Sequence, residues 1–376
     1  MKRVLSQCIK ELNQFRRDRL TVALAFLLPL AVLLIYGYAI RLEAKNIPLT
    51  IQDFDNSPLS RAYVERLFAT QQFEPAPLIE GNLTAAIDRG LAKAAVILPP
   101  DFEKTLKSRQ PTVQALVDGT DVNNARIIQA SLRATTRFFV RTSIFKAAEN
   151  QSPINASVRL WFNPGRKESL YIVPGIFGVI LWVFPSMLSG IALVREKEEG
   201  TVAQVYASDL SSAEWLLGKE LAYLLIGLGE AVIVMTVAAI LFELRFRGDP
   251  TTLIIGTVAY LAASVAFGLF VGARASNQTG AVQGTAIAGF LTALLLSGFI
   301  YRIENIPFPL SLLSNIIPAR YFIEITRDAF VRGTGWIGVW YAPLMIVLIG
   351  GFFSAQPPKY STECNSSTNA SPRLPH

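Results

Sequence analysis

Residues 169–194, SLYIVPGIFGVILWVFPSMLSGIALV, contain no charged side chain, and REKEEGT follows directly at 195–201. A helix needs about 20 apolar residues to cross a bilayer, so this stretch predicts a transmembrane helix that ends at a charged boundary. That change from apolar to charged residues decides the fold class, because it marks the point where the chain leaves the bilayer.

Five further runs have a similar length and character. They are Leu20–Ile40, Leu221–Phe242, Pro250–Ala273, Ala275–Tyr301 and Gly333–Pro358, and Glu230 is their one charged residue. The whole chain is 51% hydrophobic and only 17% charged, whereas soluble proteins carry about 25% charged residues. The sequence therefore predicts an α-helical polytopic membrane protein with six transmembrane helices.

The basic residues predict how these helices are oriented. Six of the 35 Lys and Arg residues precede the first run, and with an inner N-terminus the short inner segments carry twelve and the short outer segments six. Because cytoplasmic loops are enriched in Lys and Arg, we expect both termini in the cytoplasm. The same placement explains the net charge of +7 without nucleic acid. Residues 1–19 are amphipathic, typical of a helix on the membrane surface or of an ordinary basic flank.

Residues 41–168 have the composition of a soluble domain, with 16 basic and 13 acidic residues once Arg41 is assigned to the membrane boundary. Strands are predicted at 47–52, 94–98 and 112–118, and helices from 58, over 83–90, from 102 toward 107, and over 121–148. This alternation indicates an inserted α/β domain, which the first span would carry out of the cytoplasm. Acids near the predicted strand ends are either ligands or turn caps: Asp53, Asp55, Asp118 and Asp121.

Residues for catalysis or metal binding are sparse. The one histidine is His376, and the two cysteines are Cys8 and Cys364. The pair Gly218-Lys219 is followed by Glu220, whereas a phosphate-binding loop has Ser or Thr at that position. We therefore predict no enzymatic activity and no catalytic, metal or cofactor site. Energy for any transport would come from another subunit or from an ion gradient.

The segment 195–219 is the most informative one. Four charged residues at 196–199 precede Gly200 and Thr201, and Ser211 to Glu214 have the spacing of a capping box that opens the next helix. A hinge followed by a helix suits mechanical coupling to a cytoplasmic partner. A plain solvated loop is the alternative.

Residues 195–219 resemble the loop between the second and third spans of the membrane-spanning (permease) subunit of ABC-2 type ATP-binding-cassette exporters. Residues 307–333 resemble that family's external segment before the last span, which enters the membrane as short helices. A large extracytoplasmic domain is typical of the family's drug-efflux-like branch. The positions that fit the loop are Arg195, Glu196, Glu198, Gly200, Thr201, Leu210, Ser211, Glu214, Gly218 and Lys219.

The sequence departs from the family in three places. Val194 stands where an acidic residue is usual, and one extra residue precedes Gly200. The end of the chain is also atypical, because Pro357 and Pro358 follow the last apolar run.

The resemblance implies a permease that exports a hydrophobic or amphiphilic substrate, drug-like or lipid-like, across a bacterial inner membrane. ATP would be bound by a separate ATPase subunit, so this chain would hold no cofactor. Further partners would be a second permease subunit, identical or different, and a periplasmic adaptor. The alternative function is a receptor or scaffold whose external domain binds a ligand and signals through the loop. Residues implied in coupling are Glu196, Lys197, Glu198, Glu199, Gly200 and Thr201.

Other candidate residues lie in the spans and on the outer side. Glu230 inside a span is costly and often functional. It either faces a substrate path, in which Gln283 is a second candidate, or pairs with a polar residue such as Gln283, or lies near enough to a span end to reach the lipid headgroups. Arg320 and Glu324 have the i, i+4 spacing of a helical ion pair, and Arg327 follows them in the re-entrant segment.

The expected order along the chain is a cytoplasmic amphipathic segment (1–19), helix 1 (20–40), the extracytoplasmic α/β domain (41–168), helix 2 (169–194), the coupling loop (195–219), helices 3–5 (220–301), the external re-entrant segment (302–332), helix 6 (333–356) and a C-terminal tail (357–376).

Overall fold

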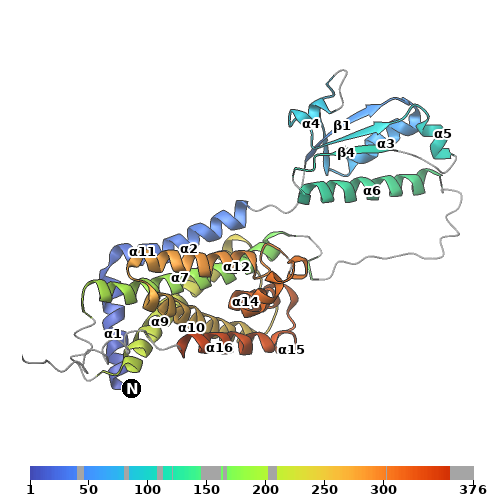
Figure 1. Cartoon of the computed structure of the whole chain (residues 1–376). Coiled ribbons are helices and arrows are strands. Elements are labelled where there is room, and N and C mark those ends of the chain that lie inside the picture. The colour runs from blue at the N-terminus through green and yellow to red at the C-terminus, as the bar shows by residue number, and fades with distance from the viewer. Residues whose placement is uncertain are drawn as a thin grey trace, which may run out of the picture. The chain divides into compact units, whose positions relative to one another are not determined.

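The computed structural model describes residues 1–39, 46–79, 84–107, 113–120, 122–144, 162–163, 167–201, 210–301 and 303–355. The chain divides into two compact units. Met1–Ile40 and Leu160–His376 form a helical unit, and Arg41–Arg159 form an α/β unit (Figure 1). The predicted tail 357–376 lies outside the described residues.

The described part of the helical unit contains four helices that are long and apolar enough to cross a membrane. This supports the predicted membrane class, and four of the six predicted spans are present at that length. The four helices are α2 (Arg19–Ala39), α7 (Ser169–Glu198), α9 (Ser212–Leu241) and α10 (Pro250–Arg274).

The other two predicted spans are built differently. The run 275–301 forms α11 (Gln278–Thr285), a π-helical stretch η1 (Ala286–Leu291) and α12 (Thr292–Leu295). The last run forms α15 (Trp336–Val339) and α16 (Tyr341–Ser354), which is shorter than the four long helices. Crossing of the membrane by these two segments stays a prediction.

Helix α7 lies at the centre of the helical unit, packed closely against α10. Ser264 Oγ donates to the Trp182 carbonyl at 2.6 Å, and Ser189 Oγ donates to the Val265 carbonyl at 3.1 Å. At Gly268 an added Cβ would lie 2.0 Å from the Ser186 carbonyl oxygen, so only glycine permits this approach. Small residues and short interhelical hydrogen bonds are how helices associate in lipid.

The α/β unit is built on a four-stranded sheet in the order β2-β1-β3-β4. Strand β1 pairs in parallel with β2 and β3, and β3 pairs antiparallel with β4. The strands are β1 (Ile47–Asp53), β2 (Phe73–Pro75), β3 (Ala94–Leu98) and β4 (Gln114–Val117). The helices are α3 (Pro58–Ala69), α4 (Ala85–Asp88), α5 (Phe102–Lys107) and α6 (Val122–Ile144).

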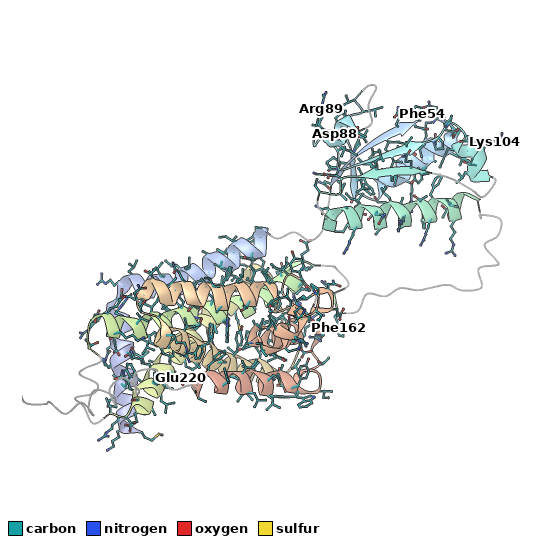
Figure 2. The ribbon with its side chains drawn as sticks, in the orientation of Figure 1. Phe54, Asp88, Arg89, Lys104, Phe162 and Glu220 are labelled. Carbon is teal, nitrogen blue, oxygen red and sulfur yellow. The ribbon has the colours of Figure 1, made fainter. Side chains whose placement is uncertain are left out.

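This unit has its own core, to which β1, β3, α3, α5 and α6 all contribute. The predicted strands and helices of the region are present with slightly different bounds, and residues 145–148 at the predicted end of the last helix lie outside the described residues. Ser57 caps α3 as its sequence suggests. Strand β2 was not predicted, because a three-residue strand is too short to show alternation. The side chains of Phe54, Arg89 and Lys104 lie on the surface of the unit (Figure 2).

Candidate functional site

The predicted coupling segment begins at the end of α7. The helix continues through Glu198, Glu199 caps it, and Gly200 has φ +69, a left-handed conformation that favours glycine. Helix α9 then opens with the predicted capping box, since Ser211 Oγ accepts from the Glu214 amide and the Glu214 carboxylate accepts from the Ser211 amide. Residues 202–209 lie outside the described part of the chain.

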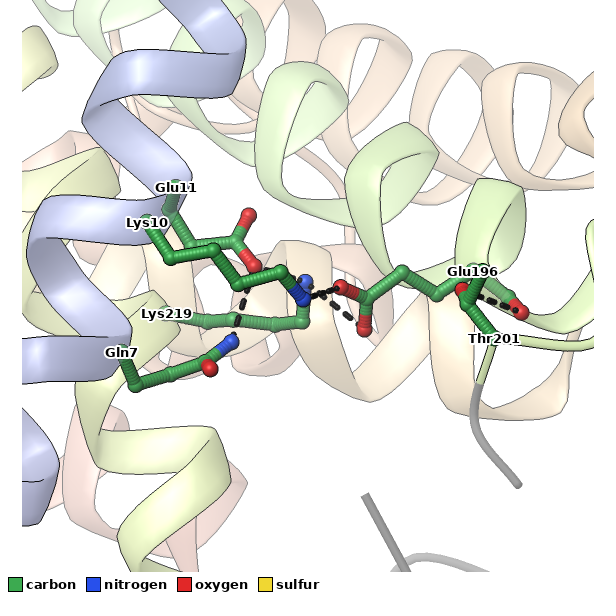
Figure 3. A network of polar contacts seen from close by, with 6 residues as sticks. All are labelled: Gln7, Lys10, Glu11, Glu196, Thr201 and Lys219. Carbon is green, nitrogen blue, oxygen red and sulfur yellow. Dashed lines mark hydrogen bonds and ion pairs between the residues drawn. The ribbon is translucent and has the colours of Figure 1, made fainter. Parts of the chain in front are cut away.

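Four charged side chains from three helices meet beside this segment, and we call them the junction cluster: Lys10 and Glu11 of α1 (Lys2–Arg17), Glu196 of α7 and Lys219 of α9 (Figure 3). Lys219 Nζ lies 2.7 Å from Glu11 Oε1 and 3.1 Å from Glu196 Oε2. Lys10 Nζ lies 2.8 Å from Glu196 Oε1. The cluster therefore ties the N-terminal helix to the C-terminal end of α7 and to the N-terminal end of α9.

Three of these four side chains are withdrawn from solvent. Lys219 is fully buried, and Glu11 and Glu196 are nearly so, whereas the Lys10 side chain is 49% exposed. Burial raises the pKa of the Glu11 carboxyl, although the Lys219 ammonium opposes the shift. An unpaired charge at such depth would be strongly unfavourable, so two positive and two negative groups at one site balance each other.

Gly218 explains how α1 approaches α9 so closely. A Cβ on Gly218 would lie 2.6 Å from Gln7 Cβ and 3.1 Å from the Val4 carbonyl oxygen. Gln7 Nε2 in turn donates to Glu11 Oε1 at 2.9 Å. The pair Gly218-Lys219 therefore has a structural role, in which the glycine admits α1 and the lysine binds it.

Helix α1 differs in part from the amphipathic prediction. Its buried residues are Gln7, Cys8 and Glu11, while Leu5 and Ile9 are about half exposed. The apolar side chains of α1 therefore do not share one buried face, because Cys8 is buried while Leu5 and Ile9 reach the surface. Exposed Leu5 and Ile9 suit a membrane surface, which stays a prediction.

Two further contacts hold the C-terminal end of α7. Lys197 Nζ donates to the carbonyls of Gly272 and Ala273 at the end of α10, at 2.7 and 3.0 Å. This is a favourable position for a cation, at the negative end of the helix dipole. Glu198 accepts from the Gln278 amide at 3.0 Å, at the first turn of α11. The end of α7 is therefore joined to α10 and α11.

Arg195 extends these contacts to the start of α2. Its Nη1 donates to Asp18 Oδ2 at 3.1 Å. Hydrogen bonds from the Thr21 hydroxyl and amide, with a smaller contribution from Arg195, hold the pKa of Asp18 below its usual value. The bend between α1 and α2 is thus linked to α7.

The six predicted coupling residues are in different surroundings. Glu196 and Lys197 make the inward contacts just described, and Thr201 Oγ1 donates back to the Glu196 carbonyl at 3.2 Å. Glu198, Glu199 and Gly200 are exposed. Sequence reasoning did not select Lys10 or Glu11, although an acid between Cys8 and Leu12 on a largely apolar face is a signal of a buried partner.

Glu230 and Gln283 are not brought together. Glu230 is fully buried in α9, and neither of its carboxylate oxygens has a hydrogen-bond partner in the part of the chain that the structure describes. Gln283 is exposed on α11. The predicted pairing is therefore wrong, and a role of Glu230 in a substrate path stays a prediction.

The predicted re-entrant segment consists of short helices: η2 (Ile303–Asn305), α13 (Leu310–Leu313), η3 (Ser314–Ile316), α14 (Pro318–Arg327) and η4 (Asp328–Arg332). The predicted pair is present, with Arg320 Nε 4.0 Å from Glu324 Oε1. The Arg327 guanidinium lies 4.1 Å from the ring centre of Tyr171 on α7. These contacts explain how arginines are accommodated here.

The acids near the strand ends of the α/β unit have local roles. Asp53 Oδ1 accepts from the amides of Asp55 and Asn56 at 3.0 and 3.1 Å. Asp55 Oδ2 accepts from the Glu103 amide at 3.2 Å, and Asp118 pairs with Lys93. Asp53, Asp55 and Asp118 are therefore turn and cap residues, and Asp121 lies outside the described residues.

Known proteins match nearly the whole chain. The family described as ABC-2 family transporter protein matches residues 19–355. The probable multidrug ABC transporter permease YbhS of Escherichia coli K12 is 26% identical over 344 residues, which cover 88% of this chain and 89% of the relative. The probable multidrug ABC transporter permease YbhR of the same strain is 26% identical over 345 residues, covering 90% and 93%. The inner membrane transport permease YhhJ of Shigella flexneri is 25% identical over 314 residues, covering 81% and 82%. The chain therefore belongs to the ABC-2 transporter family and is a membrane-embedded permease subunit.

Proposed function

We propose that this chain forms the translocation path of an exporter that is driven by ATP hydrolysis in a separate subunit. The observation that carries the proposal is the family match over residues 19–355. The sequence has no phosphate-binding loop of its own, so the nucleotide would be bound by an ATP-binding-cassette ATPase partner.

The proposed substrate is a hydrophobic or amphiphilic molecule, drug-like or lipid-like. Two relatives are named as probable multidrug permeases, and the predicted spans offer mainly apolar walls. Glu230 would attract a cationic substrate if the path opened beside it.

The proposed assembly contains two permease subunits, identical or different, each with six spans. Both termini would be cytoplasmic, in a bacterial inner membrane, because the inner segments carry more Lys and Arg. The α/β unit would then lie outside the cytoplasm, where a periplasmic adaptor is a further partner.

Force from the ATPase would enter through the segment between α7 and α9. Glu199 and Gly200 are exposed and available to a partner, and Glu198 is exposed while it accepts from Gln278 of α11. Glu196 and Lys197 join the same turn to α1, α9 and α10. A partner shifts a conformational equilibrium only through different contacts with its two states. Contacts at residues 198–200 would therefore be transmitted to three helices at once.

The test is ATP-dependent transport by the chain with its ATPase. The affinity-tagged permease is purified from its native membrane, any ATP-binding-cassette subunit that accompanies it is identified, and the pair is reconstituted into vesicles. We expect ATP-dependent movement of a lipophilic fluorescent dye, with an ATPase variant that cannot hydrolyse ATP as the control. Purification without an ATPase, together with dye movement indifferent to ATP, would contradict the proposal.

A further inference from the structure

The α/β unit contains a cavity of about 400 Å³ between its sheet and helix α6. We propose that this cavity binds a compact amphiphilic anion, a molecule with an apolar body and one carboxylate, sulfonate or phosphate group. The inference rests on the walls of the cavity and is independent of the translocation path.

The floor of the cavity is apolar because of strand alternation. Ala115 and Val117 share one face of β4, and Val113, two residues before Ala115, directly precedes the strand. Ala115 pairs in register with Val96 of β3. All four line the cavity, together with Leu132 of α6. The small side chain of Ala115 leaves space where a larger residue would fill the centre of the strand.

The rim of the cavity is cationic. Gln129, Arg133 and Arg137 are spaced by four along α6, which places them on one helix face, and all three line the cavity. Both arginines are exposed, and neither guanidinium forms a hydrogen bond or ion pair with another described residue. No acid is among the described lining residues.

The hydroxyl groups of Thr136 and Tyr63 at the cavity both donate their protons to acceptors within the protein. Thr136 Oγ1 donates to the Leu132 carbonyl at 2.7 Å, so the contact of 2.7 Å between Thr136 and Tyr63 requires the Tyr63 hydroxyl as donor. The remaining donors are the two guanidinium groups and the Gln129 amide. This set is complementary to an oxyanion, which guanidinium groups bind in a bidentate manner.

The size of the cavity limits the ligand class. Small-molecule sites occupy about 300–1,000 Å³ and combine apolar walls with a few polar groups. A volume of 400 Å³ admits one or two fused rings or a short acyl chain with its anionic group at the rim.

The test uses the full-length chain in phosphatidylcholine nanodiscs, titrated calorimetrically with naphthalene-2-sulfonate. Its neutral counterpart, naphthalene-2-sulfonamide, is the matched ligand. We expect the sulfonate to bind at least about tenfold more tightly, since hydrogen bonds to charged groups are the stronger ones. Absent binding of the sulfonate, or equal binding of the two ligands, would overturn the proposal.

Matched variants identify the site. Arg133→Gln and Arg137→Gln should each weaken sulfonate binding by about tenfold, and Ala115→Leu should weaken binding of both ligands by filling the cavity. Arg126→Gln makes the same charge change on α6 at a residue that does not line the cavity, and should bind as the unaltered chain does. If Arg126→Gln weakened binding as much as Arg133→Gln, general charge attraction rather than this site would be responsible.

A second lipid composition distinguishes the sources of the anion. If nanodiscs containing phosphatidylglycerol suppress sulfonate binding, an anionic lipid occupies the cavity. If they leave binding unchanged, the ligand is a soluble molecule. Either result supports the proposed class once the variants have located binding in the cavity.

Discussion

At the scale of single residues, Lys219 has the largest predicted effect. Its ammonium group is fully buried between Glu11 and Glu196. Lys219→Met would leave Glu11 without its cation, and removing one partner of a buried pair costs about 3–5 kcal/mol. Lys10 belongs to the same cluster but is half exposed, and its partner Glu196 would keep Lys219, so Lys10→Met should cost less than Lys219→Met. The free energy of unfolding in detergent measures both.

Cys8 supplies a direct test of where that destabilisation acts. It is buried on α1 one turn from Glu11, so its thiol should react slowly with a maleimide in a Cys364→Ser background. Lys219→Met should speed the reaction by releasing α1, and Lys10→Met should not. Equal labelling in the two variants would contradict a role for Lys219 in holding α1.

Gly218 yields a second residue-scale prediction. An alanine Cβ there would meet Gln7 and the Val4 carbonyl, so Gly218→Ala should lower the midpoint of thermal unfolding and expose Cys8. Gly229 of the same helix has its nearest neighbour 3.9 Å away, at Phe26. Gly229→Ala should leave the midpoint unchanged or raise it, because alanine favours a helix by up to about 1 kcal/mol. If both variants lowered the unfolding midpoint by a similar amount, alanine in α9 would itself be destabilising, and the contact of Gly218 with α1 would have no particular role.

At the scale of elements, the turn after α7 should depend on backbone conformation. Gly200 has φ +69 with nothing near its Cβ position, and proline fixes φ near −65°. Gly200→Pro should reduce substrate-stimulated ATPase activity and transport while the chain still inserts into the membrane. Gly200→Asn is the control, since asparagine tolerates the left-handed region. Full activity of the proline variant would show that this turn does not participate in coupling.

The pairing of α7 with α10 should be much less tolerant. Gly268→Ala would place a methyl group 2.0 Å from the Ser186 carbonyl oxygen, and overpacking of a tight interface costs about 1–3 kcal/mol or more. We expect a lower yield of folded protein and a lower unfolding midpoint by fluorescence size-exclusion chromatography. Gly351→Ala in α16, where no atom lies within 4 Å, is the matched control. An unchanged midpoint for Gly268→Ala would mean that the two helices can separate freely.

At the scale of the whole molecule, local patterns predicted the elements and missed their long-range contacts. Apolar length identified four long helices, and a short continuous apolar run identified the strand 94–98. The ion pair between Glu11 and Lys219 joins residues 208 positions apart, and nothing in either local pattern specifies that partner. That Gln283 is not the partner of Glu230 has the same cause, because polar residues in two helices do not reveal which faces meet.

Orientation is the whole-molecule property that separates the proposed exporter from an inverted arrangement. One long helix, α7, separates Lys104 in the α/β unit from Glu199, so the two should lie on opposite sides of the membrane. Lys104 and Glu199 are both exposed, so cysteines at these positions are available to a membrane-impermeant maleimide in a Cys8→Ser, Cys364→Ser background. We expect Lys104→Cys to be labelled in intact spheroplasts and Glu199→Cys only after permeabilisation, with Arg89→Cys as a second outer site. The reverse pattern would invert the charge-based orientation, and labelling of both from one side would mean that α7 does not cross the membrane.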